Sequence, residues 1–221
     1  MRASGTGPGD IAPDGSAVEF YAALPPDTAS AALVHAAIPD GASILELGAG
    51  TGRVTHPLLD LGHPVVAVDD SAAMLARIEG ARTVRSRIED LALPETFDAV
   101  LLMSFLIGYG DRRVLLDACR RHLAPSGHVI VQRESPEMFA TAAPSTWERD
   151  GVRYRMHDVS RPEPGILSAA IEYRMGDRTW THRFTSRHLG DEELPAVLAA
   201  SGLRLDRYLD EARGWILASP L

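Results

Sequence analysis

The chain has no lysine, a single cysteine and fewer cations than acids. All of its 22 cationic residues are arginine, 30 residues are aspartate or glutamate, and the formal net charge is −8. Because proteins bind phosphate backbones mainly through clustered cations, this balance argues against a nucleic-acid partner. We expect the substrate to be a small molecule.

Long apolar runs are also missing. No stretch reaches the length that spans a membrane, and residues 1–10 lack the apolar segment of a signal peptide. These absences predict a cytoplasmic protein without membrane contact. Cys119 has no second cysteine to pair with and lies among leucines at helical spacing, which indicates a packed core thiol. No set of Asp, His and Cys has the spacing of metal ligands, so we predict no metal site.

What the chain does have is an alternation of short strand and helix signals. A helix-rich entry over 16–38 breaks at Pro25 and Pro26, and a helical pattern over 191–200 precedes two apolar runs. Such alternation predicts a parallel, doubly wound α/β sheet with ligands at the carboxyl ends of its strands. The expected parallel strands cover 43–47, 64–69, 83–87, 97–103 and 128–133.

The stretch from Ser43 to Arg53 carries the strongest signal. An apolar run ends in three alternating glycines, Gly48, Gly50 and Gly52, and a helix-like segment follows. Glycine tolerates positive φ and lets a ligand approach the backbone, and the next helix offers unpaired N–H groups. The stretch therefore predicts a nucleotide-binding loop.

Three residues narrow the choice of nucleotide. Arg53 occupies the third glycine position of the dinucleotide fingerprint, where close helix packing favours glycine. Glu46 would repel a pyrophosphate and attract a ligand with an ammonium group, such as S-adenosylmethionine (SAM). Asp69 ends the next apolar run and can accept hydrogen bonds from a ribose diol. These residues fit SAM better than NAD.

Several linked segments resemble the class I SAM-dependent methyltransferases, and especially their small-molecule branch with the type 11/25 methyltransferase domain. The segments are Glu46–Gly52, Val68–Leu75, Arg87–Leu91, Phe97–Val100 and Leu123–His128. Their shared order makes the resemblance more specific than the glycines alone. One departure is Arg87, where the family often has an acidic residue.

The resemblance implies a Rossmann-like sheet of seven strands, mostly parallel, with an antiparallel last strand, and it implies SAM as the cofactor. It also implies that Tyr21 closes over the cofactor and that Ile88 and Glu89 flank the adenine. The cofactor-binding residues expected in this way are Tyr21, Glu46, Gly48, Ala49, Gly50, Gly52, Asp69, Asp70, Met74, Ile88, Glu89, Met103 and Phe105.

The pattern changes between residues 136 and 186. Two alternating runs, 166–175 and 178–186, flank Gly176 and Asp177, a two-residue hairpin signal. This turn pairs Met175 with Arg178 and sets the register of the whole hairpin. The apolar face then carries the pairs Tyr173 with Trp180, Ile171 with His182 and Ala169 with Phe184.

We interpret this segment, 136–186, as an antiparallel β lid inserted after the fifth strand, with 152–158 as a candidate third strand. Residues 16–135 and 187–221 would form the SAM-binding core, and residues 1–15 a flexible tail.

Methyl transfer is an in-line displacement in which positioning supplies much of the rate, and a general base helps when the acceptor is a hydroxyl or an ammonium. His182 is the first candidate base because its apolar face also carries Trp180 and Phe184; simple packing is the alternative. His157 and Glu134 are further candidates. A strand-end pair with Arg133 is the alternative for Glu134.

Tyr109 and Trp180 are the expected substrate-binding residues. The run Met103-Ser104-Phe105 replaces the Asn/Asp-Pro-Pro-aromatic signature of adenine-type amino methyltransferases, so we do not expect methylation of DNA bases.

These observations favour a SAM-dependent methyltransferase that acts on an oxygen or nitrogen of a metabolite or natural product. One alternative keeps SAM but cyclises or decarboxylates it or the substrate. An NAD-dependent oxidoreductase is opposed by Glu46 and Arg53, and a non-catalytic SAM-binding protein would have an acceptor pocket without a base. We leave the oligomeric state open, with a homodimer among the alternatives.

Overall fold

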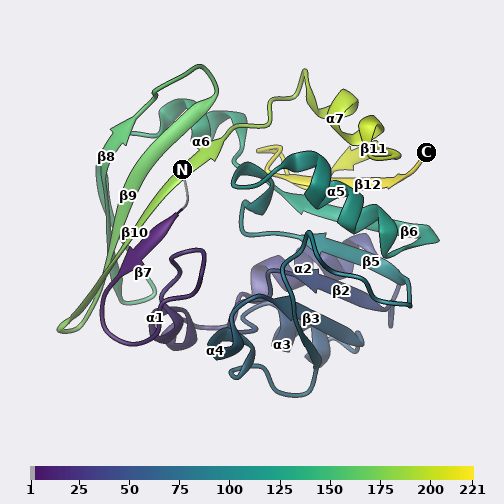
Figure 1. The fold of residues 1–221 in the computed structure, drawn as a ribbon, viewed down its shortest axis with the longest axis horizontal. Coiled ribbons are helices and arrows are strands. Elements are labelled where there is room, and N and C mark those ends of the chain that lie inside the picture. The colour runs from purple at the N-terminus through teal and green to yellow at the C-terminus, as the bar shows by residue number, and fades with distance from the viewer. Residues whose placement is uncertain (1–2) are drawn as a thin grey trace.

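The structure is a computed structural model that describes residues 3–221. It contains a seven-stranded sheet and a five-stranded sheet that lie side by side, with the five-stranded sheet on the left in Figure 1. The chain enters through the smaller sheet, builds most of the larger one, returns to the smaller one and ends in the larger one.

The seven-stranded sheet has the strand order β11-β12-β6-β5-β2-β3-β4. Neighbours from β6 to β4 run parallel, and β12 runs antiparallel to both β6 and β11. This mixed Rossmann-like sheet confirms the predicted α/β class. Its strands are β2 (Ile44–Leu47), β3 (Val65–Asp69), β4 (Arg82–Arg85), β5 (Phe97–Leu102), β6 (Leu123–Gln132), β11 (Leu203–Tyr208) and β12 (Trp215–Pro220).

Helices cover both faces of this sheet, so its central strands β2 and β5 are mostly apolar. On one face, α2 (Thr28–Ala37) and α3 (Thr55–Asp60) pack against side chains of β2 and β5. On the other face, α5 (Arg112–Arg121) and α7 (Leu194–Ala200) do the same. A shorter helix, α4 (Ala72–Leu75), follows β3. No helix within residues 3–221 is long and apolar enough to cross a membrane.

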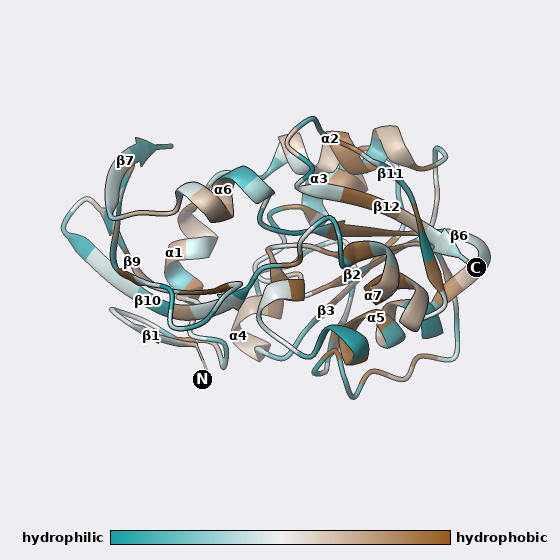
Figure 2. Ribbon diagram, turned by 90° about the horizontal axis from the view of Figure 1, so that it is seen from above, coloured by the Kyte–Doolittle hydropathy of each residue, from teal (hydrophilic) through white to brown (hydrophobic). Residues whose placement is uncertain are grey.

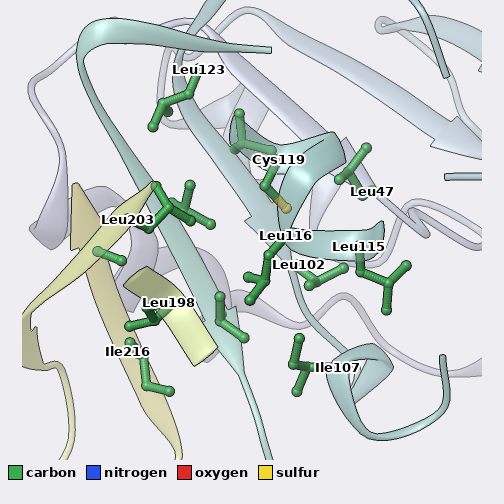
Figure 3. Packing of buried hydrophobic residues seen from close by; sticks show 14 of the residues in the cluster. Leu47, Leu102, Ile107, Leu115, Leu116, Cys119, Leu123, Leu198, Leu203 and Ile216 are labelled. Atoms are coloured by element: carbon green, nitrogen blue, oxygen red, sulfur yellow. The ribbon is translucent and has the colours of Figure 1, made fainter. Parts of the chain in front are cut away.

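Cys119 lies inside the second of these packed faces (Figure 3), beside Leu116 and Leu47. It is fully buried, and burial raises the pKa of its thiol to about 12. The predicted packed core thiol is confirmed, because a thiol with such a pKa stays protonated and inert near neutral pH.

The five-stranded sheet is antiparallel, with the order β1-β10-β9-β8-β7. Its strands are β1 (Ser4–Thr6), β7 (Ser145–Arg149), β8 (Val152–Ser160), β9 (Ile166–Met175) and β10 (Arg178–Arg187), and α6 (Pro136–Thr141) lies just before β7 in the chain. The β9–β10 register pairs Met175 with Arg178, Tyr173 with Trp180 and Phe184 with Ala169. The hairpin prediction is confirmed, and β8 supplies the third strand.

Residues 1 and 2 of the expected flexible tail over 1–15 lie outside the described residues, and the rest differs from that expectation, because β1 pairs with the edge of β10. The Trp180 Nε1–H also donates to the Pro8 carbonyl at 2.8 Å. A Cβ at Gly7 would lie 2.3 Å from the Trp180 ring, so glycine permits this close approach. The polar, glycine-rich segment has no apolar alternation, and its pairing partner is distant in sequence, so its pattern alone predicted no strand.

The first helix, α1 (Val18–Ala23), also departs from the predicted domain division. We expected it in the core, but Phe20 stacks on Tyr173 of the five-stranded sheet, with ring centroids 4.4 Å apart. Val18, on the same helix, packs with Met74 of α4. Figure 2 shows α1 and α6 between the two sheets. The N-terminal helix therefore joins the small sheet to the large one.

Candidate active site

The glycine loop connects β2 to α3 and has the backbone that a ligand-binding turn requires. Gly48, Gly50 and Gly52 have φ values of 72°, 57° and 83°, a region that L side chains rarely adopt. A Cβ at Gly50 would meet no atom within 4 Å, whereas one at Gly48 would lie 2.5 Å from Leu106 Cδ1. The backbone at Gly50 therefore borders open space that a ligand can enter.

Asp69, at the end of β3, holds this loop in place. Its Oδ2 accepts the Gly50 N–H and its Oδ1 accepts the Ser71 N–H, each at 2.9 Å. Burial raises the pKa of Asp69, and the two backbone hydrogen bonds counter part of that rise. A carboxylate oxygen can accept more than one hydrogen bond, so Asp69 keeps acceptor capacity beside the loop that it positions.

Glu46 lies in β2, two residues before the first glycine, and is only 2% exposed. Its Oε2 accepts the Thr55 hydroxyl at 2.6 Å, which links the strand to α3. Burial raises the pKa of Glu46 to about 7, and the neighbouring charge of Asp69 adds to the rise. The predicted contact with a ligand ammonium stays a prediction.

The remaining cofactor residues predicted from the sequence follow the carboxyl ends of neighbouring strands. Asp70 follows β3 directly, and Ile88 is half-buried against the core. Glu89 is exposed and forms an ion pair with Arg87. Ala49, Met74 and Met103 are all buried. The topology therefore places these residues at one edge of the sheet.

The segment after β5 has an unusual backbone. Ser104 and Phe105 have φ values of 54° and 60°, and the Ser104 N–H donates to Gln132 Oε1 at 2.8 Å. Two successive non-glycine residues in the left-handed region store strain, which is typical of functional sites. Phe105 was among the predicted cofactor residues, but no sequence pattern predicted this conformation.

Tyr21 on α1 lies where the two sheets meet. It packs with Met74 on the side of the large sheet and with Tyr173 on the side of the small sheet. Burial raises the pKa of its hydroxyl. This position is consistent with the predicted closure over the cofactor, which no contact in the structure tests.

The inner face of β10 presents Trp180, His182, Phe184 and Ser186 in series. Trp180 is 1% exposed and packs against Phe20, so the structure places this predicted substrate-binding residue in a core that α1 covers. The His182 Nε2–H donates to the Asp14 carbonyl at 3.2 Å. Farther along the same face, the side chains reach the carboxyl edge of the large sheet.

Phe184 and Ser186 meet two predicted site residues there. The Phe184 ring lies edge-on to that of Tyr109, with centroids 6.0 Å apart, and Tyr109 is 40% exposed. The Ser186 hydroxyl donates to Glu134, which is 6% exposed. A Cβ at Gly108 would lie 2.6 Å from Ser186 Oγ and 3.3 Å from Glu134 Oε2, so glycine makes room for this contact. The structure therefore brings Tyr109 and Glu134 together.

Glu134 does not form the strand-end pair with Arg133 that we considered. The Arg133 side chain is fully buried and donates instead to the carbonyls of Leu189 and Arg213 and to Asp191. Burial raises the pKa of Glu134, and the Ser186 hydroxyl counters part of that rise.

His157 lies on the opposite face of the small sheet from His182. It pairs with Ala170, whereas Met156 pairs with Ile171, the partner of His182, and successive residues of a strand alternate between faces. Its Nδ1 lies 3.2 Å from Asp158 Oδ2. The two candidate histidines are therefore not part of one site.

Two arginines hold the return from the small sheet to the large one, a role that the sequence did not predict for either of them. Arg112 donates to the carbonyls of Arg187 and His188, at 2.7 and 2.5 Å, and Arg133 donates to that of Leu189. Charged side chains near helix and strand ends usually indicate solvent exposure, so the pattern gave no signal for this buried role.

Comparisons with known proteins agree with this geometry. Residues 45–131 match the family described as the methyltransferase domain. This part of the chain is therefore similar to a methyltransferase domain. The matched segment covers the glycine loop, Asp69 and the strands up to β6, so the predicted resemblance is confirmed.

Similar proteins extend the match. A cypemycin N-terminal methyltransferase from Streptomyces sp is 33% identical over 144 residues, which cover 58% of this chain and 59% of that protein. A ubiquinone biosynthesis O-methyltransferase from Xanthomonas oryzae pv. oryzae is 33% identical over 115 residues, 46% of this chain and 48% of that protein. The chain therefore aligns with only about half of the length of these relatives.

A solved structure shares the fold over nearly the whole chain. SAM-bound CalS10, an amino pentose methyltransferase from Micromonospora echinaspora, has a TM-score of 0.69 at 23% identity, over 94% of this chain and 93% of that protein. The fold therefore includes the small sheet as well as the domain matched by sequence.

Proposed function

We propose that this protein is a SAM-dependent methyltransferase that transfers a methyl group to an oxygen or nitrogen of a small molecule. The observation that carries the proposal is the glycine loop, which is open at Gly50 and tied to Asp69 by a 2.9 Å hydrogen bond. The methyltransferase domain over 45–131 and the SAM-bound relative with the same fold support it.

The residues at this edge fit SAM. Asp69 would hold the ribose with its remaining acceptor capacity, and Glu46 would attract the ammonium group of the methionyl part. Ile88 and Glu89 would flank the adenine, and Tyr21 would cover the cofactor from the side of the small sheet. When bound, SAM supplies an activated methyl group on a positively charged sulfur.

The rest of the reaction depends on how the chain holds the acceptor. We propose that the small sheet acts as a lid that excludes water and orients the acceptor between Tyr109 and Phe184. Glu134 and His182 lie on this side and could each take a proton from the acceptor, whereas His157 lies on the far face. His157 is therefore the weakest of the three candidate bases.

We retain a small-molecule acceptor, and no nucleic acid, as part of the proposal. The net charge of −8 supports it, because this excess of acid repels a phosphate backbone. The predicted cytoplasmic location stays a prediction.

Calorimetry with SAM, S-adenosylhomocysteine (SAH) and NAD tests the assignment. We expect SAM and SAH to bind the wild-type protein and NAD to give no heat of binding. Tight NAD binding without a response to SAM would overturn the proposal in favour of an oxidoreductase. Binding of SAM followed by its conversion to a cyclised or decarboxylated product, detected by mass spectrometry, would favour the non-methylating alternative.

A further inference from the structure

Glu134 is a buried carboxylate whose only side-chain hydrogen bond within residues 3–221 comes from a neutral donor, the Ser186 hydroxyl. It forms no ion pair with any side chain of that described part. Burying a carboxylate without a cationic partner is costly, so proteins seldom keep one where packing alone would serve. The charge of Arg112 lowers the pKa of Glu134, but no cationic side chain of residues 3–221 forms an ion pair with its carboxylate. A cation bound in contact with Glu134 would therefore be stabilised.

The arginines nearest to Glu134 are engaged elsewhere. The terminal nitrogens of Arg112 donate to the carbonyls of Arg187 and His188 and to Glu193. Those of Arg133 donate to Leu189 and Asp191. The Nε of Arg112 has no hydrogen-bond partner within residues 3–221, but it is buried. No terminal arginine nitrogen of these two residues is therefore free for a carboxylate or phosphate of an acceptor, which disfavours an anionic acceptor group.

The neighbouring surface suits a cation instead. Tyr109 is half-exposed beside Glu134 and meets Phe184 edge-on, which forms an aromatic wall. Aromatic faces attract ammonium groups through the charge distribution of the ring. The carboxylate and the aromatic wall therefore favour the same kind of ligand.

We propose that the acceptor is an amine and that its nitrogen is held at the Glu134 carboxylate, between Tyr109 and Ser186. This inference rests on the proposed function and narrows the acceptor atom from oxygen or nitrogen to nitrogen. An amine arrives mainly as an ammonium, whose nitrogen has no free electron pair. One proton passes from that nitrogen to the carboxylate, which leaves a neutral amine beside a neutral Glu134 and frees the electron pair for bonding.

Glu134 is suited to this role because burial raises its pKa, which makes it a stronger base than an exposed glutamate. The competing explanation is structural: the contact between Glu134 and Ser186 could serve only to fix the small sheet on the large one. Glu134→Gln separates the two, because glutamine can still accept the Ser186 hydrogen bond but carries no charge.

The experiment measures binding of matched probes to the protein saturated with SAH, by calorimetry. The probes are benzylamine against benzyl alcohol, cyclohexylamine against cyclohexanol, and glucosamine against glucose. We expect at least one amine to bind about tenfold more tightly than its alcohol, the difference that one charge-assisted contact provides. In E134Q this preference should disappear while the SAH affinity stays within about twofold of the wild type.

A matched variant serves as the control. Glu137→Gln changes an exposed glutamate on α6 and should leave the amine preference unchanged.

The inference is overturned if no amine is preferred over its alcohol by wild-type protein, a result that needs no variant. It also fails if E134Q keeps the preference, or if E134Q weakens SAH and amine binding alike, as a structural role would. Failure of the wild-type protein to bind SAM or SAH is a separate result, because it would overturn the proposed function itself.

Discussion

The two sheets differ in how completely they are buried. All four residues of β2, at the centre of the large sheet, are buried, whereas all five residues of β7, at the edge of the small sheet, are exposed. The large sheet has helices on both faces, but the small one has α1 over only part of its inner face. The large sheet thus forms a rigid base for the glycine loop, and the small sheet leaves part of its inner face uncovered.

The outer face of the small sheet also differs from the buried face of a packed sheet, because like charges lie next to each other on it. Arg153 and Arg174 lie directly opposite each other, although like charges in such pairs are destabilising. Both are exposed, so solvent screens them. The segment matched by sequence, residues 45–131, lies mostly in the well-packed sheet. This agrees with our proposal that the small sheet, where packing is incomplete, recognises the acceptor.

The largest expected effect comes from removing Phe20, which packs α1 on the small sheet. Phe20→Ala deletes a buried ring that stacks on Tyr173, and such deletions cost about 3–5 kcal/mol. We expect the loss to loosen the small sheet far more than the large one. Hydrogen exchange should show faster exchange in β9 and β10 with little change in β2 and β5. Equal acceleration in both sheets would mean that they unfold as one unit.

Glu46 makes the stability of the large sheet depend on pH. Its pKa is about 7 in the fold against an ordinary 4.5, so the folded state holds a proton that the unfolded state has lost between these values. The free energy of unfolding should therefore fall as pH rises from 4.5 to 7, by up to about 3 kcal/mol.

Glu46→Gln should remove this dependence. Denaturant unfolding at pH 4.5 and pH 8 would show E46Q gaining stability relative to the wild type as pH rises, whereas the exposed control E137Q should follow the wild type. If the difference between E46Q and wild type is the same at both pH values, the carboxyl of Glu46 is not protonated in the fold.

The two sheets also differ in how much of their structure could be predicted from the sequence. The parallel strands could be predicted because apolar runs and alternating helices are local signals, and the β9–β10 register because a two-residue turn at Gly176 fixes it. The pairing of β1 with β10 and the packing of α1 on Tyr173 join segments more than 150 residues apart. No local pattern specifies such pairings, so the sequence did not predict them.

The difference between local and long-range signals also explains why one half of the site could be predicted and the other could not. The glycine loop and Asp69 belong to one β-strand–helix–β-strand unit, and spacing alone was sufficient to predict both. The contact between Ser186 and Glu134 depends on how the small sheet docks, so the sequence suggested Glu134 but not its partner. Trp180 was predicted on the correct face, but α1 covers that part of the face.

Asp69→Ala tests the cofactor-binding half of the site. The change removes the acceptor of the Gly50 N–H and the proposed acceptor of the ribose hydroxyls. Each hydrogen bond contributes roughly 0.5–1.5 kcal/mol, so SAH affinity should fall about tenfold or further. Calorimetry would measure it, and thermal unfolding would check that the loop variant is folded. An unchanged affinity would place the ribose elsewhere.

The smallest effects are expected from substitutions of His182 and His157, which lie on opposite faces of the small sheet. His182 lies on the inner face and holds the Asp14 carbonyl, so His182→Gln should raise the KM for the acceptor or lower kcat while leaving SAH affinity unchanged. His157 lies on the outer face beside Asp158, so His157→Ala should leave kcat and KM within about twofold of the wild type. Steady-state kinetics on the acceptor found in the amine screen would compare the two.

A loss of activity in H157A with a normal H182Q would reverse the assignment of the faces, because only the face toward the large sheet can reach the acceptor. Normal activity in both variants would make His182 a packing residue and leave Glu134 as the candidate base.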